Sequence, residues 1–520
     1  MADAALISVY DRTGVVDLAR ALVEHGIPVY ATGGTRAHLR EHGIEARDVG
    51  ELTGYPSLFS GRVKTLHPNV FGGILHDRES AEHRAEAELH RIPTIATVVV
   101  NLYPFEETVA QEGATLQEAV EQIDIGGVSL LRAAAKNFEY VTVLSDPAQY
   151  DAFAVALPHG LDRATRRSFA TRAFERTAEY DSAIARYLES GMLTNELPGS
   201  LALTIPIEQP LRYGENPQDR AAFYLAREAQ LPEQLGGKAL SYNNLLDLDA
   251  TLRLLVRAAP GLALDGDGAP NPPLARAAIV KHTVPCGVSE RATVAEAVRE
   301  ALAADPVSAY GGIIAVDAVV DADAAEELAG FFLEIVAAPA FSDDALARLR
   351  KKKNLRIMRF KRGLPERIAE ELRVRSALGG ILAEDDDPQA PPERWSVVSR
   401  RRPSASEWRD LVFAWDVVRH VKSNGVVIAR DGVSRGICAG QTNRVSAVQI
   451  AAHRAHGFVR GAACASDGFF PFADGLIAAA DAGCTAVIAP QGSIRDAEVI
   501  AAADERGVAL VFSTYRYFLH

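Results

Sequence analysis

Residues 61–68 combine two cations, a hydroxyl group and an imidazole within one short segment. They include Arg62, Lys64, Thr65 and His67, whose polar side chains are unsuited to a hydrophobic core. In an extended segment, the side chains of Arg62 and Lys64 point to the same side. The segment is therefore a candidate binding site for an anionic group, and a solvated basic loop is the alternative.

A Gly-Gly pair marks a second candidate site for an anion. Gly33, Gly34 and Thr35 follow a predicted buried strand at residues 27–32 and begin a predicted helix. Glycines at such a turn allow backbone N–H groups to close on an anion, and the helix N-terminus adds positive potential. The pattern is typical of phosphate binding, although a simple turn is the alternative.

Two further pairs of polar residues flank apolar segments of the N-terminal region. Asp124 and Lys136 stand at opposite ends of a predicted short helix, where they could instead be a helix cap and an exposed cation. Asn101 and Tyr103 follow the apolar residues 97–100, which predict a buried parallel strand. Ligands of open α/β sheets collect at the carboxyl ends of such strands. These residues are therefore candidates for one catalytic site.

Another candidate centre follows the apolar residues 277–280, which lead into Lys281 and His282. This pair suits acyl transfer, because histidine can take a proton from an attacking amine while lysine supports the carbonyl oxygen. A structural role for His282 is the alternative. Arg212 and Tyr213 lie in a predicted turn, where arginine can bind a phosphate and tyrosine can stack or donate.

The elements that must position these residues alternate along the N-terminal part of the chain. Short β-rich runs at residues 6–10, 27–32, 97–101 and 140–145 alternate with amphipathic segments at residues 15–25, 35–42, 116–122 and 165–187. The alternation predicts a parallel sheet with helices on both faces. Residues 190–210, with three prolines and two glycines, predict an interdomain linker. The remainder is also mixed α/β, with a surface loop expected at residues 265–273.

The composition excludes several classes of protein. The 520 residues are too many for one core, and 48% hydrophobic with 24% charged residues are ordinary globular values. No apolar run is long enough to span a membrane, and the first residues do not form a signal peptide. The formal charge of −13 argues against a general nucleic-acid binder. Four cysteines without a C-x-x-C pair fit a reducing cytoplasm.

In order and spacing, the motifs around Lys64, Tyr103, Asp124 and Lys136 resemble one half of a bifunctional purine-biosynthesis family. This family combines phosphoribosylaminoimidazolecarboxamide formyltransferase with inosinate (IMP) cyclohydrolase. The resemblance extends from Ser8 to His520. It implies the last two steps of purine synthesis: formyl transfer from 10-formyltetrahydrofolate to aminoimidazole carboxamide ribotide (AICAR), then ring closure of the formylated product (FAICAR) to IMP.

The resemblance also implies an α/β fold with three parts. Residues 1–197 would form a cyclohydrolase domain, doubly wound and similar to methylglyoxal synthase. Residues 198–209 would be the linker. Residues 210–520 would form a formyltransferase domain of two α/β subdomains similar to cytidine deaminase, with a possible division near residues 385–402, which are rich in Asp, Pro and Arg.

Ring closure requires a carboxamide nitrogen, a poor nucleophile, to attack the formyl carbon with loss of water. A proton acceptor and support for an oxyanion are therefore needed. The resemblance implies that Lys64, Tyr103, Asp124 and Lys136 are the catalytic residues. It implies that substrate is bound by Arg12, Thr13, Gly33, Gly34, Thr35, Arg62, Thr65, Asn101, Gly126 and Gly127.

The chain departs from the family near its start. The family usually reads Ser-Val-Ser-Asp-Lys-Thr-Gly there, whereas this chain has Tyr10 in place of the second serine and Arg12 in place of the lysine. Arginine keeps the charge but changes its geometry. Further departures are Gln218, Val284 and Glu384, which stand where histidine, asparagine and glutamine are common.

For the formyltransferase half, the resemblance implies that Lys281, His282 and Asn424 are catalytic. It implies that the ribotide and the folate are bound by Arg212, Tyr213, Asn244, Gly312, Glu334, Arg444, Phe469, Pro471, Asp474 and Arg516. Glu334 would bind the pterin, and Asp474 would lie close to the folate. The donor would be a dissociable cosubstrate, with no tightly bound cofactor and no metal. The resemblance further implies a cytoplasmic homodimer with this site near the subunit interface, and no nucleic-acid or membrane partner.

Residues 348–362 hold nine cations and no acid. A solvated charged face is the default interpretation, and contact with nucleic acid is an alternative. A third hypothesis is that the stretch attracts an anionic cosubstrate such as a polyglutamylated folate.

Two other functions compete with this interpretation. A zinc-dependent deaminase requires H-x-E and P-C-x-x-C motifs, and neither is present: Pro285 and Cys286 are followed by Gly287, Val288 and Ser289. A regulatory module that senses a phosphorylated ligand could use the N-terminal domain alone. Such a sensor would not need the reactive set of Lys64, Tyr103, Asp124 and Lys136.

Overall fold

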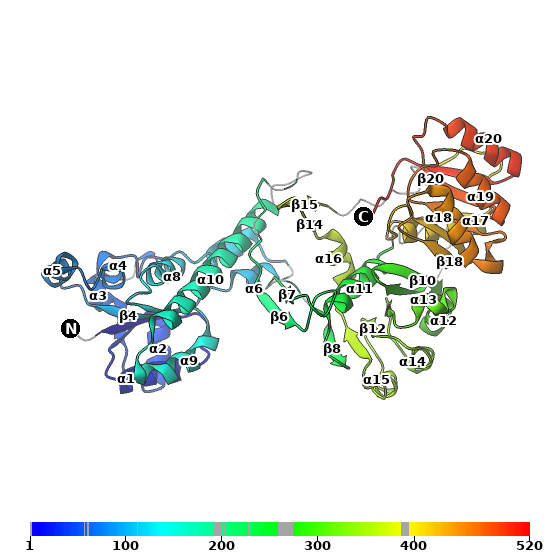
Figure 1. Cartoon of the computed structure of the whole chain (residues 1–520). Coiled ribbons are helices and arrows are strands. Elements are labelled where there is room, and N and C mark those ends of the chain that lie inside the picture. The colour runs from blue at the N-terminus through cyan, green and yellow to red at the C-terminus, as the bar shows by residue number, and fades with distance from the viewer. Residues whose placement is uncertain are drawn as a thin grey trace. The chain divides into compact units, whose positions relative to one another are not determined.

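The chain folds into two compact units, residues 1–206 with 224–229 and residues 207–223 with 230–520. The computed structural model describes residues 3–56, 58–59, 62–111, 113–190, 197, 199–201, 203–226, 229, 231–257, 274–385 and 395–520 (Figure 1). Gly61, the loop expected at residues 265–273, and parts of the segments expected at 190–210 and 385–402 lie outside the described residues.

The first unit is a doubly wound α/β domain, as the alternation of strands and helices predicts. Its elements are β1 (Ala4–Ser8), α1 (Val15–Glu24), β2 (Val29–Ala31), α2 (Gly33–Glu41), β3 (Arg47–Asp48), α3 (Val49–Thr53), α4 (Pro68–Leu75), α5 (Ala81–Leu89), β4 (Ile95–Val100), α6 (Phe105–Val109), α7 (Leu116–Glu121), α8 (Gly126–Lys136), β5 (Thr142–Leu144), α9 (Tyr150–Ala156) and α10 (Arg163–Ser190). The five strands are parallel in the order β3-β2-β1-β4-β5.

The period of two along the strands divides the side chains of this sheet between two cores. Leu6 of β1 and Val98 of β4 point to the face covered by α4, α8 and α10. Ile7 and Val99 point to the opposite face, which α1 and α9 cover (Figure 1). Because both faces are buried, the strands are almost continuously apolar, which explains why the sequence predicts a parallel sheet.

The second unit contains one twelve-stranded mixed sheet with two halves. The first half comprises β8 (Glu233–Gly236), α11 (Tyr242–Arg253), β9 (Ala275–Lys281), β10 (Val284–Arg291), α12 (Val294–Ala304), α13 (Pro306–Ala309), β11 (Ile313–Val316), α14 (Ala322–Ala329), β12 (Ile335–Ala338), α15 (Asp343–Leu349), β13 (Arg356–Arg359) and α16 (Leu364–Glu370). The strands β14 (Arg373–Ala377) and β15 (Gly380–Glu384) follow it in the chain and pair with each other in a separate two-stranded sheet. The second half comprises β16 (Ser396–Val397), α17 (Ala405–Val418), β17 (Val426–Arg430), β18 (Val433–Cys438), α18 (Arg444–Arg454), β19 (Ala463–Ser466), α19 (Asp474–Ala482), β20 (Ala486–Pro490), α20 (Asp496–Arg506) and β21 (Ala509–Ser513). At the boundary with the first unit lie β6 (Ile207–Leu211) and β7 (Ala221–Tyr224).

The two halves repeat one topology. Their strand orders are β10-β9-β11-β12-β13-β8 and β18-β17-β19-β20-β21-β16, with antiparallel and parallel pairs in corresponding places. In each half, a helix is followed by a β-hairpin, and one helix residue accepts hydrogen bonds from the hairpin turn. Asp247 of α11 does so from His282 and Thr283, and Asp410 of α17 does so from Asp431 and Gly432. The prediction of two α/β subdomains is therefore confirmed.

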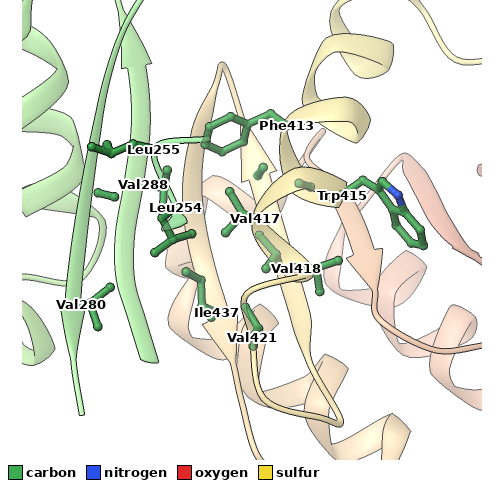
Figure 2. Close-up of a cluster of buried hydrophobic side chains, with 14 of the residues drawn as sticks. Leu254, Leu255, Val280, Val288, Phe413, Trp415, Val417, Val418, Val421 and Ile437 are labelled. Atoms are coloured by element: carbon green, nitrogen blue, oxygen red, sulfur yellow. The ribbon is translucent and has the colours of Figure 1, made fainter. Parts of the chain in front are cut away.

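A shared apolar core holds the two halves together. Leu254, Val280 and Val288 of the first half pack in one cluster with Val417 and Ile437 of the second (Figure 2). The strands β10 and β18 meet at the single register pair of Ser289 and Val433. Toward their other ends, at Val284 and Cys438, these strands have no register pair, so the sheet opens there.

Buried charges add a second connection between the halves. Arg276 of β9 is 3% exposed and contacts Asp416 of α17 at 2.6 Å and Glu290 of β10 at 2.8 Å. Arg257 contacts Glu290 at 2.8 Å and Asp317 at 2.7 Å. Because buried carboxylates are costly without a partner, this network requires the two halves to stay in their observed arrangement.

We predict that Arg276→Met lowers the free energy of unfolding of the second unit by about 3–5 kcal/mol, because it leaves Asp416 and Glu290 buried without their main cation. Urea titration followed by tryptophan fluorescence measures this, since all three tryptophans, Trp395, Trp408 and Trp415, lie in this unit.

The matched control is Arg299→Met. Arg299 pairs with Glu327 at 2.6 Å with its side chain 57% exposed, so its loss should cost less than about 1 kcal/mol. Equal effects of the two substitutions would contradict the assigned role of the buried network.

Candidate functional site

A cavity of about 1,120 Å³ opens in the first unit at the carboxyl ends of β1 and β4. From β1 the chain adds strands on one side up to β3, and from β4 it adds them on the other side. Open α/β sheets bind ligands at such a switch point in strand order. Among the residues predicted from the sequence, those that line it are Arg12, Gly34, Thr35, Arg62, Lys64, Thr65, Asn101, Tyr103, Asp124, Gly126 and Gly127. The structure therefore brings together residues that are up to 115 positions apart, from Arg12 to Gly127.

One end of this cavity suits an anion. The helix α2 begins at Gly33, and its N-cap residue Thr32 makes no side-chain hydrogen bond to the first turn. The backbone N–H groups of that turn are therefore open to a ligand. The guanidinium of Arg12 lies over the turn, because its Nη2 would be 3.4 Å from a Cβ at Gly34. The hydroxyl of Thr35 instead accepts a hydrogen bond from Val9 N, just after β1, at 3.1 Å.

Asn101 joins the ends of β1 and β4. Its Oδ1 accepts from the backbone N–H groups of Tyr10 at 2.6 Å and Asp11 at 3.0 Å, and its Nδ2 donates to Asp11 O at 2.8 Å. Its amide is thus engaged with the protein. Asn101 lines the cavity, but in this structure it positions the segment of residues 10–11.

The opposite end holds a partly buried carboxylate. Gly127 N donates to Asp124 Oδ1 at 2.7 Å at the start of α8. A Cβ at Gly127 would clash with Asp124 Oδ2, so this close approach requires glycine. Burial raises the pKa of Asp124, against the backbone hydrogen bonds from Gly127 and Tyr103 and the nearby charge of Lys64, which lower it.

Tyr103 lies beside this carboxylate. Burial and the charge of Asp124 raise the pKa of the Tyr103 phenol, so the hydroxyl stays protonated and can donate a hydrogen bond. The ring of Tyr103 also pairs edge-on with the ring of Tyr10, with centroids 5.9 Å apart.

Several residues of this site were missed by the sequence analysis. Glu121 lines the cavity and forms an ion pair with Arg62. Tyr180 of α10 accepts from Asp124 N at 3.0 Å and donates to Gln122 O at 2.5 Å, so it fixes the backbone before α8. No local pattern marks Tyr180, because its partners are more than fifty positions away.

Lys136 does not line this cavity. It lies at the other end of the eleven-residue helix α8, about 15 Å along the axis from Gly126. There it lines a separate apolar cavity of about 600 Å³ with Arg132 and Phe174. Thr13 is next to the main cavity, where its hydroxyl donates to Asp11 Oδ1 at 2.7 Å. Gly33 is the first residue of α2.

In the second unit, Lys281 and His282 lie at the β9–β10 hairpin. His282 and Thr283 form its two-residue turn with φ of 57° and 59°, the left-handed values that such a hairpin needs. Asp247 stabilises this turn by accepting from His282 N at 3.2 Å and Thr283 N at 2.6 Å. Lys281 Nζ donates to Tyr310 O at 2.8 Å. Asp247 is a third residue that the sequence analysis missed.

A cavity of about 330 Å³ lies where β10 and β18 separate. Lys281, His282 and Cys286 line one side, and Arg435 and Arg454 of the second half line the other. Burial raises the pKa of the Cys286 thiol to about 12, so this cysteine is not a nucleophile near neutral pH. The cavity is therefore rich in cations around the exposed imidazole of His282.

Glu334 lines a different cavity of about 640 Å³ with Tyr310, Lys352 and Lys353. Arg356 contacts Glu334 at 2.6 Å. Gly312 is next to Glu334, because Glu334 N donates to Gly312 O at 3.0 Å.

The basic stretch of residues 348–362 is partly engaged with the protein. Arg348 pairs with Glu326, and Arg359 Nε donates to Glu233 at 3.0 Å. Lys352 Nζ donates to Phe331 O at 2.6 Å, and burial lowers the pKa of Lys352. Only part of the stretch is therefore a solvated face, and Lys352 and Lys353 connect it to the Glu334 cavity.

The second half of this unit carries its own polar cavity of about 310 Å³, lined by Asn424, Arg444, Phe469, Pro471 and Asp474. Arg444 Nη2 donates to Asn424 Oδ1 at 2.6 Å, and Arg444 also pairs with the buried Asp467. A fourth residue missed by the sequence analysis is therefore Asp467, which holds the guanidinium in place.

The remaining predicted residues lie outside these cavities. Arg212 lies over the ring of Tyr213 at 5.6 Å, just after β6. The Asn244 side chain caps α11 by accepting from Ser241 N at 3.2 Å. Arg516 lies over the ring of Phe518 at 4.8 Å near the C-terminus.

Within the described ranges, no group of three His, Cys, Asp or Glu side chains is arranged to hold a metal ion. No helix in the described part of the chain is long and apolar enough to cross a membrane.

Comparison with known proteins gives the family of the chain. The family described as AICARFT/IMPCHase bienzyme matches residues 134–454, and the MGS-like domain family matches residues 14–129. A bifunctional purine biosynthesis protein PurH from Prochlorococcus marinus is 47% identical over 100% of both chains, and another from Desulfitobacterium hafniense is 46% identical over 99% of both. A crystal structure titled ForH is 36% identical and covers 36% of this chain and 100% of its own, with a TM-score of 0.33. The chain belongs to the AICARFT/IMPCHase bienzyme family.

Proposed function

We propose that the two activities of the family are divided between the two units, with ring closure in the first and formyl transfer in the second. The protein carries out the final two steps of IMP biosynthesis, as its family does. The observation that carries the division is the separation of the reactive residues. Lys64, Tyr103 and Asp124 share one cavity, whereas Lys281 and His282 belong to the other unit.

For ring closure, the phosphate of FAICAR would bind at the N-terminus of α2 with Arg12 and Arg62. Its carboxamide would then face Asp124. We propose that the Asp124 carboxylate takes the proton from the carboxamide nitrogen as this nitrogen attacks the formyl carbon. Lys64 supports the oxygen that becomes negative, and the protonated Tyr103 donates to it. That oxygen takes up the proton held by Asp124 and a second proton from the former formamide nitrogen, and it leaves as water while a C=N bond forms between this nitrogen and the former formyl carbon, which completes IMP.

For formyl transfer, the amine of AICAR attacks the formyl carbon of 10-formyltetrahydrofolate. His282 would take the proton from the amine, and Lys281 would support the formyl oxygen in the tetrahedral intermediate. The nitrogen of tetrahydrofolate then leaves and takes up a proton. The family assignment implies a folate cosubstrate, and we propose that it binds and dissociates with each turnover. Glu334, with aromatic and basic neighbours in its cavity, is the candidate for contact with the pterin.

We also propose that the working formyltransferase site combines two copies of the chain. Lys281 and His282 line one cavity, whereas Asn424 and Arg444 line another in the second half of the unit. A homodimer could bring the first pair of one copy to the second pair of the other. This arrangement supports the homodimer that the resemblance implies, and the cytoplasm remains the proposed location.

The family assignment favours this function over both alternatives. A deaminase would need the zinc motifs that the sequence lacks. A phosphate-ligand sensor would explain the anion end of the first cavity. It would not explain a carboxylate with a raised pKa beside Lys64 and Tyr103.

Single substitutions should separate the two activities. We predict that Lys281→Ala or His282→Ala reduces formyl transfer by at least about a hundredfold, the usual size of a general acid–base contribution, while ring closure of FAICAR is unchanged. Lys64→Ala should do the reverse. Separate assays of FAICAR formation and IMP formation measure this. Loss of both activities in one folded variant would rule out the division.

The pH dependence of ring closure should report the carboxylate. Because Asp124 must be ionised to accept a proton, kcat/KM falls as the pH drops through its pKa, and burial places that pKa above the ordinary 3.8. We therefore expect an acid limb above the usual aspartate range. Formyl transfer with AICAR is the control, because AICAR carries the same phosphate. A shared acid limb in both reactions would contradict the assignment to Asp124.

Mixing two inactive variants tests the shared site. If each site takes Lys281 from one copy and Arg444 from the other, hybrids of Lys281→Ala and Arg444→Ala contain one intact site. Mixing equal amounts under exchange conditions should then restore about a quarter of the formyltransferase activity, from the statistics of dimer assembly. No recovery, with hybrid formation verified by mass, would show that each chain builds its own site.

A further inference from the structure

Tyr10 is the most exposed aromatic side chain that lines the cavity of the first unit. It follows β1, and 56% of its surface is open to solvent. Its hydroxyl has no hydrogen-bond partner among the described residues. The ring pairs edge-on with that of Tyr103 but is more than half exposed, so burial in the core does not explain its place in the cavity.

The backbone at Tyr10 is held from both sides. On one side, Val9 N donates to the hydroxyl of Thr35 at 3.1 Å, at the start of α2. On the other side, Tyr10 N donates to Asn101 Oδ1 at 2.6 Å, at the end of β4. The backbone at Tyr10 is therefore held between α2, at the anion end of the cavity, and Asn101, which stands two residues before Tyr103.

This position matters because of the shape of the ligand. A nucleotide whose phosphate lies at α2 and whose reacting groups lie at Asp124 must cross the segment between them. Tyr10 lines this cavity, its backbone neighbour Val9 is bonded to Thr35 of α2, and its ring is next to that of Tyr103. The part of the ligand between the phosphate and the reacting groups is the ribose with its attached heterocycle.

The pairing with Tyr103 favours contact with the heterocycle. The two rings are 5.9 Å apart and inclined at 69°, the edge-on geometry that aromatic pairs prefer. Together they form an aromatic corner in the cavity. A flat imidazole or purine can stack on such a surface, and stacking of a base on an aromatic side chain is worth a measurable part of the affinity.

We propose that Tyr10 is a binding residue for the heterocycle of the nucleotide, and that it makes this site prefer nucleotides over simple sugar phosphates. The inference rests on the proposed function, because it assumes that ring closure occurs in this cavity. It concerns a residue in which this chain departs from the serine usual in the family.

The experiment measures inhibition of ring closure in the full-length protein. IMP and ribose 5-phosphate are used as competing ligands, because they share the phosphate and ribose and differ in the heterocycle. The variants are Tyr10→Ser, which removes the ring, and Tyr10→Phe, which keeps it. Backbone hydrogen bonds to Asn101 and Thr35 are available to all of them, so the fold should be kept.

We expect Tyr10→Ser to raise the inhibition constant of IMP and the KM of FAICAR by about tenfold, as loss of one stacking contact implies. The inhibition constant of ribose 5-phosphate should stay within about twofold, and Tyr10→Phe should behave like the wild type. Tyr55→Ser is the matched control. Tyr55 is 65% exposed and pairs with the ring of His67 at 5.8 Å, but it does not line the cavity.

Three results would overturn the proposal. An unchanged inhibition constant of IMP in Tyr10→Ser would show that the ring does not contact the heterocycle. Equal losses for IMP and ribose 5-phosphate would show a general disturbance of the cavity. If neither ligand inhibits the wild-type protein, the assignment of ring closure to this cavity fails, and the inference fails with it.

Discussion

A carboxylate held close to backbone N–H groups is the interaction on which the first unit depends. Asp124 sits at the start of α8, and Gly127 leaves just enough room for it. Burial raises its pKa, while Lys64 and the backbone hydrogen bonds keep it from becoming neutral too readily. These opposing effects suit the carboxylate to the base that we propose for ring closure. The sheet supports this arrangement, because the carboxyl ends of β1 and β4 bring the anion end and Asp124 to one cavity.

The second unit uses a different constraint. His282, the base that we propose for formyl transfer, is in a two-residue hairpin turn whose residues both have positive φ, a conformation that is unfavourable for residues other than glycine. Asp247 compensates by accepting two backbone hydrogen bonds from that turn. The second half of the unit repeats the device with Asp410, where the turn carries Asp431 and Gly432 and no histidine. One fold thus appears twice, and only one copy of the hairpin carries the Lys-His pair.

The fold was largely predictable because it depends on local patterns. Apolar runs with periods of two and 3.6 mark the strands and helices of the first unit, and their alternation predicts the parallel sheet. The site was predictable only where a motif is short and contiguous, as around Lys64. Tyr180 and Asp467 were not predicted from the sequence, because their partners are distant in the sequence. For Lys136 the difficulty is the reverse, because the residue is close to Asp124 in the sequence but lines a different cavity. Nearness to Asp124 in the sequence does not bring it near in space, since a straight helix separates them.

The most direct test of the account is the fate of the intermediate in Asp124→Asn, supplied with AICAR and 10-formyltetrahydrofolate. If the two reactions use separate sites and Asp124 is the base for ring closure, FAICAR should accumulate at the wild-type rate of formyl transfer, and almost no IMP should form. Wild-type IMP production by this variant would contradict the role of the carboxylate. Loss of FAICAR formation in the folded variant would contradict the independence of the two sites.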